Sequence, residues 1–139
     1  MEIKEKQFLG IEAGCSALSW QRQDGQHLWG RNYDFDRLAE GSGMIFLPRE
    51  TAYFGVNGPE GTDFSCTSRY ACAGVGLLLS PSPVLYEGMN EKGLMGGQLY
   101  YRGFAGYGKE SCPGTDPIQP PFLVYHLLAQ CATVEEAVR

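Results

Sequence analysis

Residues 14–20 have the sequence Gly-Cys-Ser-Ala-Leu-Ser-Trp, and residues 30–34 have the sequence Gly-Arg-Asn-Tyr-Asp. From the cysteine onward, the first stretch alternates Cys, Ala and Ser with Ser, Leu and Trp, and this period of two predicts a β-strand. Asp24 and Gly25 follow, and the glycine supplies the positive φ that a tight hairpin turn requires. A return strand over residues 26–32 is therefore expected, and the rest of the chain should form the scaffold and pocket around this hairpin.

The predicted hairpin brings Arg31 and Asp34 back toward the thiol of Cys15. A fixed positive charge beside a thiol favours its thiolate form, and a carboxylate can hold an ammonium group in place by accepting its hydrogen bonds. Taken separately, the cysteine would be a small buried apolar residue and the other two an exposed ion pair of little energetic value. Their combination on one hairpin predicts a nucleophile with its tuning groups.

Cleavage of the peptide bond between Gly14 and Cys15 would complete this chemistry. The new α-amine has an ordinary pKa of about 7.7–8.0 and a thiol one of about 8.5, so the amine can take the thiol proton near neutral pH. Gly14 suits such a cut because it has no side chain to block attack by the thiol on a strained backbone. Residues 1–14 are thus expected to be a propeptide that keeps residues 15–139 inactive until its removal.

The composition indicates one globular domain. The chain has 139 residues, a net charge of −5 and no run of basic residues, which argues against nucleic acid as a partner. Residues 1–14 carry charges throughout and lack the apolar core of a secretion signal, and no stretch is apolar for long enough to span a bilayer. We therefore expect a soluble cytoplasmic protein without a membrane partner.

The cysteines do not have the spacing of a disulfide framework. Their number is odd and their spacing irregular, at positions 15, 66, 72, 112 and 131. A disulfide scaffold is not expected in a chain without an export signal, and only His27 and His126 could complement the thiols around zinc. We expect neither a metal nor a cofactor, four inert thiols beside Cys15, and a core or interface role for His126.

The remaining segments predict an α+β fold, because strands precede helices with little alternation. The expected strands are residues 44–47, 51–56, 69–79, 84–87 and 94–101, loops cover 57–65 and 102–116, and a helix spans 117–131. Glycines 74 and 76 should mark a place where something approaches the backbone closely. Residues 88–93 should form a hairpin connection in which Asn90 fills a turn position, and Thr133 should cap a second helix.

Four collinear blocks resemble the choloylglycine hydrolase and penicillin V acylase family. The blocks are Cys-Ser-x-Leu from residue 15, Asp-Gly-x-His-Leu-x-Gly-Arg-Asn-x-Asp from residue 24, Pro-Arg at residue 48 and Glu-Gly-Met-Asn-Glu-Lys-Gly-Leu from residue 87. The resemblance implies an N-terminal nucleophile hydrolase with a four-layer αββα sandwich that cleaves a linear carbon–nitrogen amide bond. It implies that Cys15 is the catalytic nucleophile and that Arg31 and Asp34 are the catalytic residues flanking it.

The same resemblance gives Tyr100 a role in the oxyanion hole and implies that two further active-site residues lie beyond Arg139. Tyr100 falls where penicillin V acylases have tyrosine and typical bile salt hydrolases have asparagine, and its backbone N–H would contribute to the oxyanion hole. The family's oxyanion asparagine and a second active-site arginine would lie beyond Arg139. The resemblance thus implies the N-terminal part of a longer enzyme, or a piece that pairs with a second chain, in a dimeric or tetrameric homo-oligomer.

Several functions stay open on the sequence. The leading one is hydrolysis of a small-molecule amide, either a penicillin V-like compound or a conjugated bile salt. Alternatives are hydrolysis of other N-acyl amides such as acyl homoserine lactones, a non-catalytic fragment of such an enzyme, and a redox-sensing thiol protein. The aromatic residues at positions 100, 101, 104 and 107 could line an acyl pocket or pack at the edge of a sheet.

Overall fold

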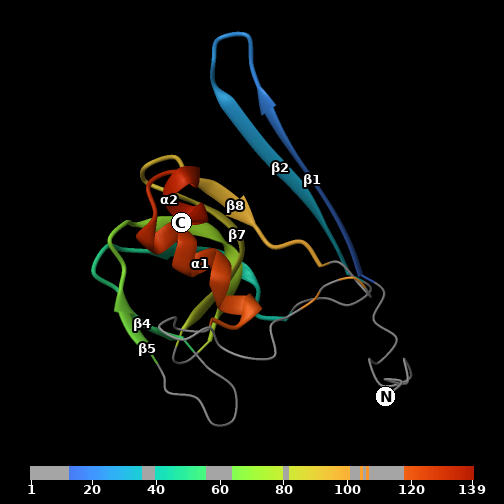
Figure 1. The fold of residues 1–139 in the computed structure, drawn as a ribbon. Helices are drawn as coiled ribbons and strands as arrows, with labels where there is room; N and C mark the ends of the chain where they lie inside the picture. The colour runs from blue at the N-terminus through green and yellow to red at the C-terminus, as the bar shows by residue number, and fades with distance from the viewer. Residues whose placement is uncertain are drawn as a thin grey trace. The chain divides into compact units, whose positions relative to one another are not determined.

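A computed structural model describes residues 13–35, 40–55, 64–79, 82–100, 104, 106 and 118–139 (Figure 1). The elements are β1 (Ala13–Gln21), β2 (His27–Phe35), β3 (Gly43–Leu47), β4 (Ala52–Gly55), β5 (Phe64–Thr67), β6 (Cys72–Leu78), β7 (Pro83–Asn90), β8 (Met95–Gly97), α1 (Pro120–Gln130) and α2 (Val134–Val138). The α+β class is confirmed. The chain divides into two compact units, of which the first combines the β1–β2 region with Leu99–Gly106.

The first unit contains the predicted hairpin. β1 and β2 pair antiparallel in an unbroken register that runs from Ala13 opposite Phe35 to Gln21 opposite His27. Gly25 has a φ of 83°, and the N–H of Gln26 donates to the Asp24 carboxylate at 3.0 Å, so the turn chemistry is as predicted. Both strands are longer than the sequence pattern indicated, and β1 begins before the thiol rather than at it.

The second unit is a four-stranded antiparallel sheet in the order β3-β6-β7-β8, accompanied by the β4–β5 ribbon. Helix α1 lies across one face of this sheet and contacts β7, β8 and β6 (Figure 1). Its buried residues Val124, Tyr125, Leu128 and Ala129 form a stripe at helical spacing, whereas Leu123 is exposed. The stripe joins a core cluster that includes Ile45, Leu47, Tyr53, Cys72 and Leu85.

Two glycines allow β6 and β7 to approach. A Cβ at Gly74 would collide with the backbone carbonyl of Glu87, and one at Gly76 with the carbonyl of Val84. The register shifts between Val75 and Gly76, which marks an irregularity of the ladder at the same place. The predicted close approach is confirmed, and the approaching group is the neighbouring strand.

Several predicted boundaries were wrong for identifiable reasons. Residues 57–65 were expected to be a loop, but Phe64 and Ser65 begin strand β5, because pairing with β4 outweighs the polar composition. The strand expected from Arg69 starts at Cys72, because the N–H groups of Arg69 and Tyr70 donate to the carbonyl of Ala129 instead. Gly88 was expected in the connection of a hairpin but belongs to β7. The prediction for residues 1–12 lies outside the described residues.

Asn90 connects the β7–β8 turn to the end of helix α1. Its side-chain nitrogen donates to the carbonyls of Leu128 at 2.8 Å and Cys131 at 2.7 Å, and its oxygen accepts from the N–H groups of Lys92 and Leu94. Asn90 is only 2% exposed, and its hydrogen bond to the Leu128 carbonyl is buried, so this carbonyl would be left without a partner if the amide were removed. The predicted turn position is confirmed, and the residue also fastens the helix to the sheet.

Helix α1 is further connected to the β4–β5 ribbon by a polar cluster. The Tyr53 hydroxyl lies 2.9 Å from Nδ1 of His126 and accepts a hydrogen bond from Gln130 at 2.9 Å. Burial lowers the pKa of His126, which keeps the ring neutral and suited to this environment. His126 is therefore an internal histidine of the scaffold, as predicted.

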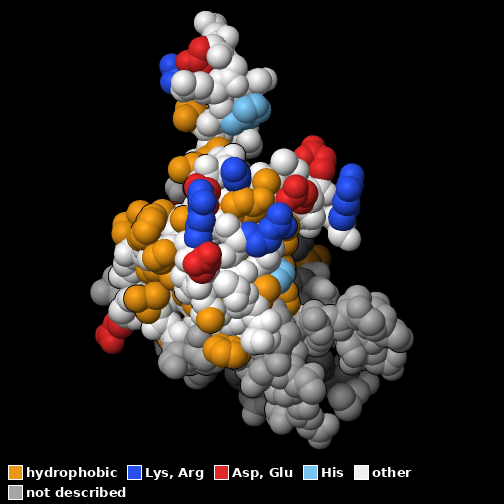
Figure 2. All heavy atoms as spheres, turned by 90° about the vertical axis from the view of Figure 1, so that its left-hand side faces the viewer, with side chains coloured by type: hydrophobic (Ala, Val, Ile, Leu, Met, Phe, Trp, Pro, Cys, Tyr) orange, Lys and Arg blue, Asp and Glu red, His pale blue; other side chains and the backbone are white. Residues whose placement is uncertain are grey.

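Helix α2 starts as predicted, because the Thr133 hydroxyl accepts the Glu136 N–H at 3.2 Å. None of the helices in the described part of the chain is both long and apolar enough to cross a bilayer. On the face of the protein shown in Figure 2, acidic and basic side chains are interspersed and apolar side chains also reach the surface.

Replacing Asn90 by alanine should lower the free energy of unfolding by about 3 kcal/mol, because several buried backbone groups lose their partner. Urea denaturation followed by circular dichroism measures this change. Asn32→Ala, at an exposed position of the hairpin, is the matched control and should change stability little. Equal stability of the Asn90→Ala and wild-type proteins would contradict the role given to this amide.

Candidate active site

The β1–β2 register places Cys15 and Arg31 on one face of the hairpin. Cys15 pairs with Tyr33 and Ala17 pairs with Arg31, so these four side chains alternate onto the same side. The guanidinium Nη2 of Arg31 donates to Sγ of Cys15 at 3.1 Å. Both residues are partly buried. The structure thus brings together the predicted nucleophile and the predicted cation in direct contact.

Asp34 lies on the opposite face of the same hairpin. It pairs with Gly14, one residue before the thiol, so its side chain is directed away from the face that carries Cys15 and Arg31. The sequence interpretation placed arginine and aspartate together beside the sulfur, and the register separates them. Asp34 instead flanks the backbone at the Gly14–Cys15 peptide, which is the place where an α-amine would form.

Gly14 has the conformation of an ordinary strand residue. It continues the ladder of β1, its φ lies outside the left-handed range, and a Cβ built on it would meet no atom within 4 Å. The strained backbone expected at this position is therefore not observed. The absence of a side chain leaves free space beside the peptide carbonyl that the thiol would attack.

Aromatic rings cover the thiol face beyond Arg31. The Arg31 guanidinium carbon lies 4.9 Å from the centre of the Tyr33 ring, within the range of a cation–π contact. Tyr33 in turn stacks on Phe35, with ring centres 4.5 Å apart and an interplanar angle of 24°. The sequence analysis did not identify either ring, although their alternate spacing after Arg31 on a predicted strand was a usable signal.

Two of the other described thiols, Cys72 and Cys131, have environments that suppress reactivity. Burial raises the pKa of Cys72 to about 11, with a further contribution from the charge of Glu91. Burial also raises the pKa of Cys131. The Cys66 sulfur accepts a hydrogen bond from Gln130 at 3.1 Å. None of the described cysteines forms a disulfide, and Cys112 lies outside the described residues. Cys15 is thus distinguished by its partner, the Arg31 guanidinium.

Two of the four sequence blocks that carried the resemblance have structural roles. Arg49 donates from Nε to a carboxylate oxygen of Glu91 at 2.6 Å, and its Nη2 pairs with the other oxygen. The Arg49 hydrogen bond and the Ala71 N–H lower the pKa of Glu91 to about 2. This ion pair joins the loop after β3 to the turn after β7, and Asn90 beside it anchors α1. The blocks around residues 48 and 90 therefore stabilise the scaffold rather than build the site.

Tyr100 follows β8 in a segment without regular secondary structure. It belongs to the same compact unit as the hairpin, and its side chain is 43% exposed. The strand predicted for residues 94–101 ends at Gly97, so Tyr100 is not held in a ladder. Phe104 is also exposed, whereas residues 101 and 107 lie outside the described residues.

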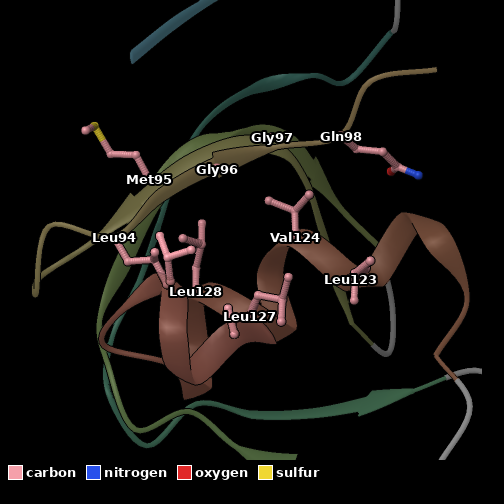
Figure 3. A pocket seen from close by; sticks show the side chains of 11 residues that line it. Leu94, Met95, Gly96, Gly97, Gln98, Leu123, Val124, Leu127 and Leu128 are labelled. Atoms are coloured by element: carbon pink, nitrogen blue, oxygen red, sulfur yellow. The ribbon is translucent and has the colours of Figure 1, made fainter. Parts of the chain in front are cut away.

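An apolar cavity of about 280 Å³ opens in the second unit, between β8 and the two helices. Figure 3 shows Leu94 near the β8 side and Val124, Leu127 and Leu128 on helix α1, with their side chains around this space. The candidate nucleophile Cys15 and its partner Arg31 belong to the other unit. This cavity is therefore a feature of the scaffold's packing and is not lined by the candidate catalytic residues.

Comparison with known proteins identifies one family of similar proteins. The profile of the linear amide C-N hydrolases, choloylglycine hydrolase family, matches residues 15–139. A bile salt hydrolase/transferase of Clostridium perfringens is 33% identical over 122 residues, which are 88% of this chain and 36% of that protein. A bile salt hydrolase/transferase of Bifidobacterium longum is 27% identical over 128 residues, or 90% of this chain and 39% of that protein.

Solved structures show the same relationship. A mutant of conjugated bile acid hydrolase from Clostridium perfringens, with a cysteine replaced by alanine, superposes with a TM-score of 0.73 at 31% identity. A second variant of that hydrolase, with an arginine replaced by leucine, gives a TM-score of 0.71. The matched region is 90% of this chain and 36% of the first structure.

The chain belongs to the linear amide C–N hydrolases of the choloylglycine hydrolase family. It spans little more than a third of the length of the relatives it matches. The described α+β elements correspond to about a third of the conjugated bile acid hydrolase structure.

Replacing Arg31 by leucine should slow alkylation of Cys15 by iodoacetamide at pH 7 about tenfold, because the sulfur loses its charged hydrogen-bond donor. Mass spectrometry of the peptide that contains Cys15 measures the rate, and the peptide that contains Cys72 serves as an internal reference. Arg22→Leu removes an exposed arginine that pairs with Asp24 at the hairpin turn and should have no such effect. An unchanged rate in Arg31→Leu, or an equal loss in Arg22→Leu, would contradict the assignment.

Proposed function

We propose that this chain supplies the nucleophile of a cysteine-dependent enzyme that hydrolyses a linear carbon–nitrogen amide bond. The observation that carries the proposal is the 3.1 Å contact between Arg31 and the Cys15 sulfur on the hairpin of a family member. The altered cysteine and arginine of the two solved hydrolase variants are sixteen positions apart, which is also the separation of Cys15 and Arg31. This agreement in spacing supports the same pairing here.

In this proposal, activation starts with attack of the Cys15 thiol on the carbonyl carbon of Gly14. The carbon–nitrogen bond breaks as a thioester forms, the nitrogen takes up a proton, and water then hydrolyses the thioester. Residues 1–14 leave with a new carboxylate, and Cys15 gains a free α-amine. Asp34 is opposite Gly14 in the ladder, and we propose that its carboxylate holds the resulting ammonium group.

During turnover, the α-amine takes the proton of the thiol, and the sulfur attacks the carbonyl carbon of the substrate. Arg31 favours the thiolate by its fixed charge. The negative oxygen that forms on the substrate requires N–H donors, for which we propose the backbone of Tyr100 together with an asparagine from outside residues 1–139. The amine product leaves with the proton from the α-amine, and water hydrolyses the acyl thioester to release the acid.

We propose a conjugated bile salt as the leading substrate class, because the relatives described above are bile salt hydrolases. A penicillin V-like amide is the second candidate, and Tyr100 favours it because tyrosine at this position resembles penicillin V acylases. Other N-acyl amides have no specific observation in their favour. The remaining alternative is a non-catalytic fragment. Such a chain would fold and carry the nucleophile, but without the remaining catalytic groups it would not turn over a substrate.

The surface of the described residues supports assembly with further protein. Met44 and Phe46 are 77% and 70% exposed on the face of the sheet away from α1. Leu18, Trp20 and Leu28 are exposed on the hairpin. A two-stranded hairpin is marginally stable alone, and exposed apolar faces of this kind normally pack against another layer. We propose that a second sheet completes an αββα sandwich here, supplied by further sequence or by a second chain, within a homo-oligomer.

Replacing Cys15 by serine in the full-length protein should reduce amide hydrolysis at least about a hundredfold, because the hydroxyl is a far weaker nucleophile near neutral pH. Release of glycine from glycocholate and of the free amine from penicillin V measures the activity toward the two substrate classes. Cys131→Ser is the control and should retain activity, because that thiol lies in the scaffold. Full activity of Cys15→Ser toward either substrate would refute the proposed function.

A further inference from the structure

The Tyr33 ring lies next to the contact between Arg31 and Cys15. In the β1–β2 register it is directly opposite Cys15, and its ring centre lies 4.9 Å from the guanidinium carbon that contacts the thiol. We propose that Tyr33 is a positioning residue, whose ring face holds the Arg31 guanidinium so that Nη2 stays at the Cys15 sulfur. Its effect on turnover rests on the function proposed above, whereas its effect on the thiol can be measured without turnover.

The chemistry of the site favours an aromatic ring for this task. Arginine has a long side chain with considerable rotamer entropy, and on a largely exposed hairpin it needs a second contact to keep one geometry. The face of a ring attracts the guanidinium without contributing a negative charge.

Arg69 shows the same kind of contact elsewhere in the described chain. Its guanidinium carbon lies 5.4 Å from the centre of the Tyr70 ring, and its Nη1 donates to the backbone carbonyl of Gln130 at 3.2 Å. Arg31 combines the same two kinds of contact, a ring face and a polar acceptor, and its acceptor is the Cys15 sulfur. A ring face together with one acceptor limits the positions that a guanidinium can take.

Phe35 extends the same row of side chains. Positions 31, 33 and 35 alternate onto one face of β2, and the rings of Tyr33 and Phe35 are stacked. Tyr33 and Phe35 are 39% and 38% exposed, so the stack is half-buried and its order depends on these mutual contacts. Phe35 therefore restricts the Tyr33 ring, and the Tyr33 ring restricts Arg31.

The test compares Tyr33→Leu, which removes the ring, with Tyr33→Phe, which retains the ring face and removes only the hydroxyl. Alkylation of Cys15 by iodoacetamide is measured from pH 6 to pH 9 in the full-length protein, with Cys72 as the internal reference. Tyr33→Leu should slow the reaction at pH 7 about threefold, whereas Tyr33→Phe should match the wild type.

A double-mutant cycle separates positioning from a general effect on the fold. In an Arg31→Leu background, Tyr33→Leu should cause no further slowing, because the group that it positions is absent. An equal effect with and without Arg31, or identical alkylation rates for Tyr33→Leu and the wild type, would overturn the proposal. If Tyr33→Leu does not fold, Tyr33→Val, a residue suited to strands, tests the same prediction with the same outcomes.

These outcomes also distinguish this inference from the proposed function. A protein without amide hydrolase activity can still show the shift in Cys15 alkylation, which would support positioning by Tyr33 and count against the enzymatic role. Conversely, an active enzyme whose Cys15 alkylation does not change in Tyr33→Leu would support the enzymatic role and count against positioning by Tyr33.

Discussion

The register of the β1–β2 hairpin is the constraint on which the candidate site depends. Side chains alternate between the faces of a strand, so the pairing of Cys15 with Tyr33 decides that Arg31 contacts the sulfur. A slip by one residue would move the arginine to the opposite face and the aspartate to the thiol side. The turn at Gly25 helps to hold this register, because it closes the hairpin with the positive φ that only a few residues adopt easily. The chemistry of the site is therefore determined by the backbone of one hairpin.

The residues that make the sequence resemble its family serve two different purposes. The blocks that contain Cys15 and Arg31 bring a thiol and a guanidinium into contact on one hairpin. The blocks that contain Arg49, Asn90 and Glu91 fasten loops and helix α1 around the sheet through an ion pair and a buried amide. The thiols also differ between scaffold and candidate site. Burial keeps the scaffold thiol Cys72 protonated, whereas Cys15 on the hairpin has a cation as its partner. A shared sequence pattern thus contains both the candidate nucleophile and the contacts that stabilise the scaffold.

The local rules of sequence predicted much of this structure. Alternation and the Asp-Gly turn predicted the hairpin, glycines 74 and 76 predicted a close approach, and Thr133 predicted the start of α2. Strand β5 was missed because its pairing with β4 is a long-range contact that short polar segments do not reveal. The separation of Asp34 from Arg31 was missed because proximity was inferred from the hairpin alone, without counting which face each residue occupies. The aromatic stack at Tyr33 and Phe35 depends on the same register.

The central claim is that Cys15 becomes an N-terminal nucleophile that carries the acyl group during turnover. The most direct test is acid quenching of the full-length protein during hydrolysis of glycocholate, followed by mass spectrometry of the intact chain and its peptides. The account predicts a chain that begins at Cys15 and a cholyl thioester on its sulfur. Hydrolysis by a chain that still begins at Met1, or an acyl group on another cysteine, would contradict it.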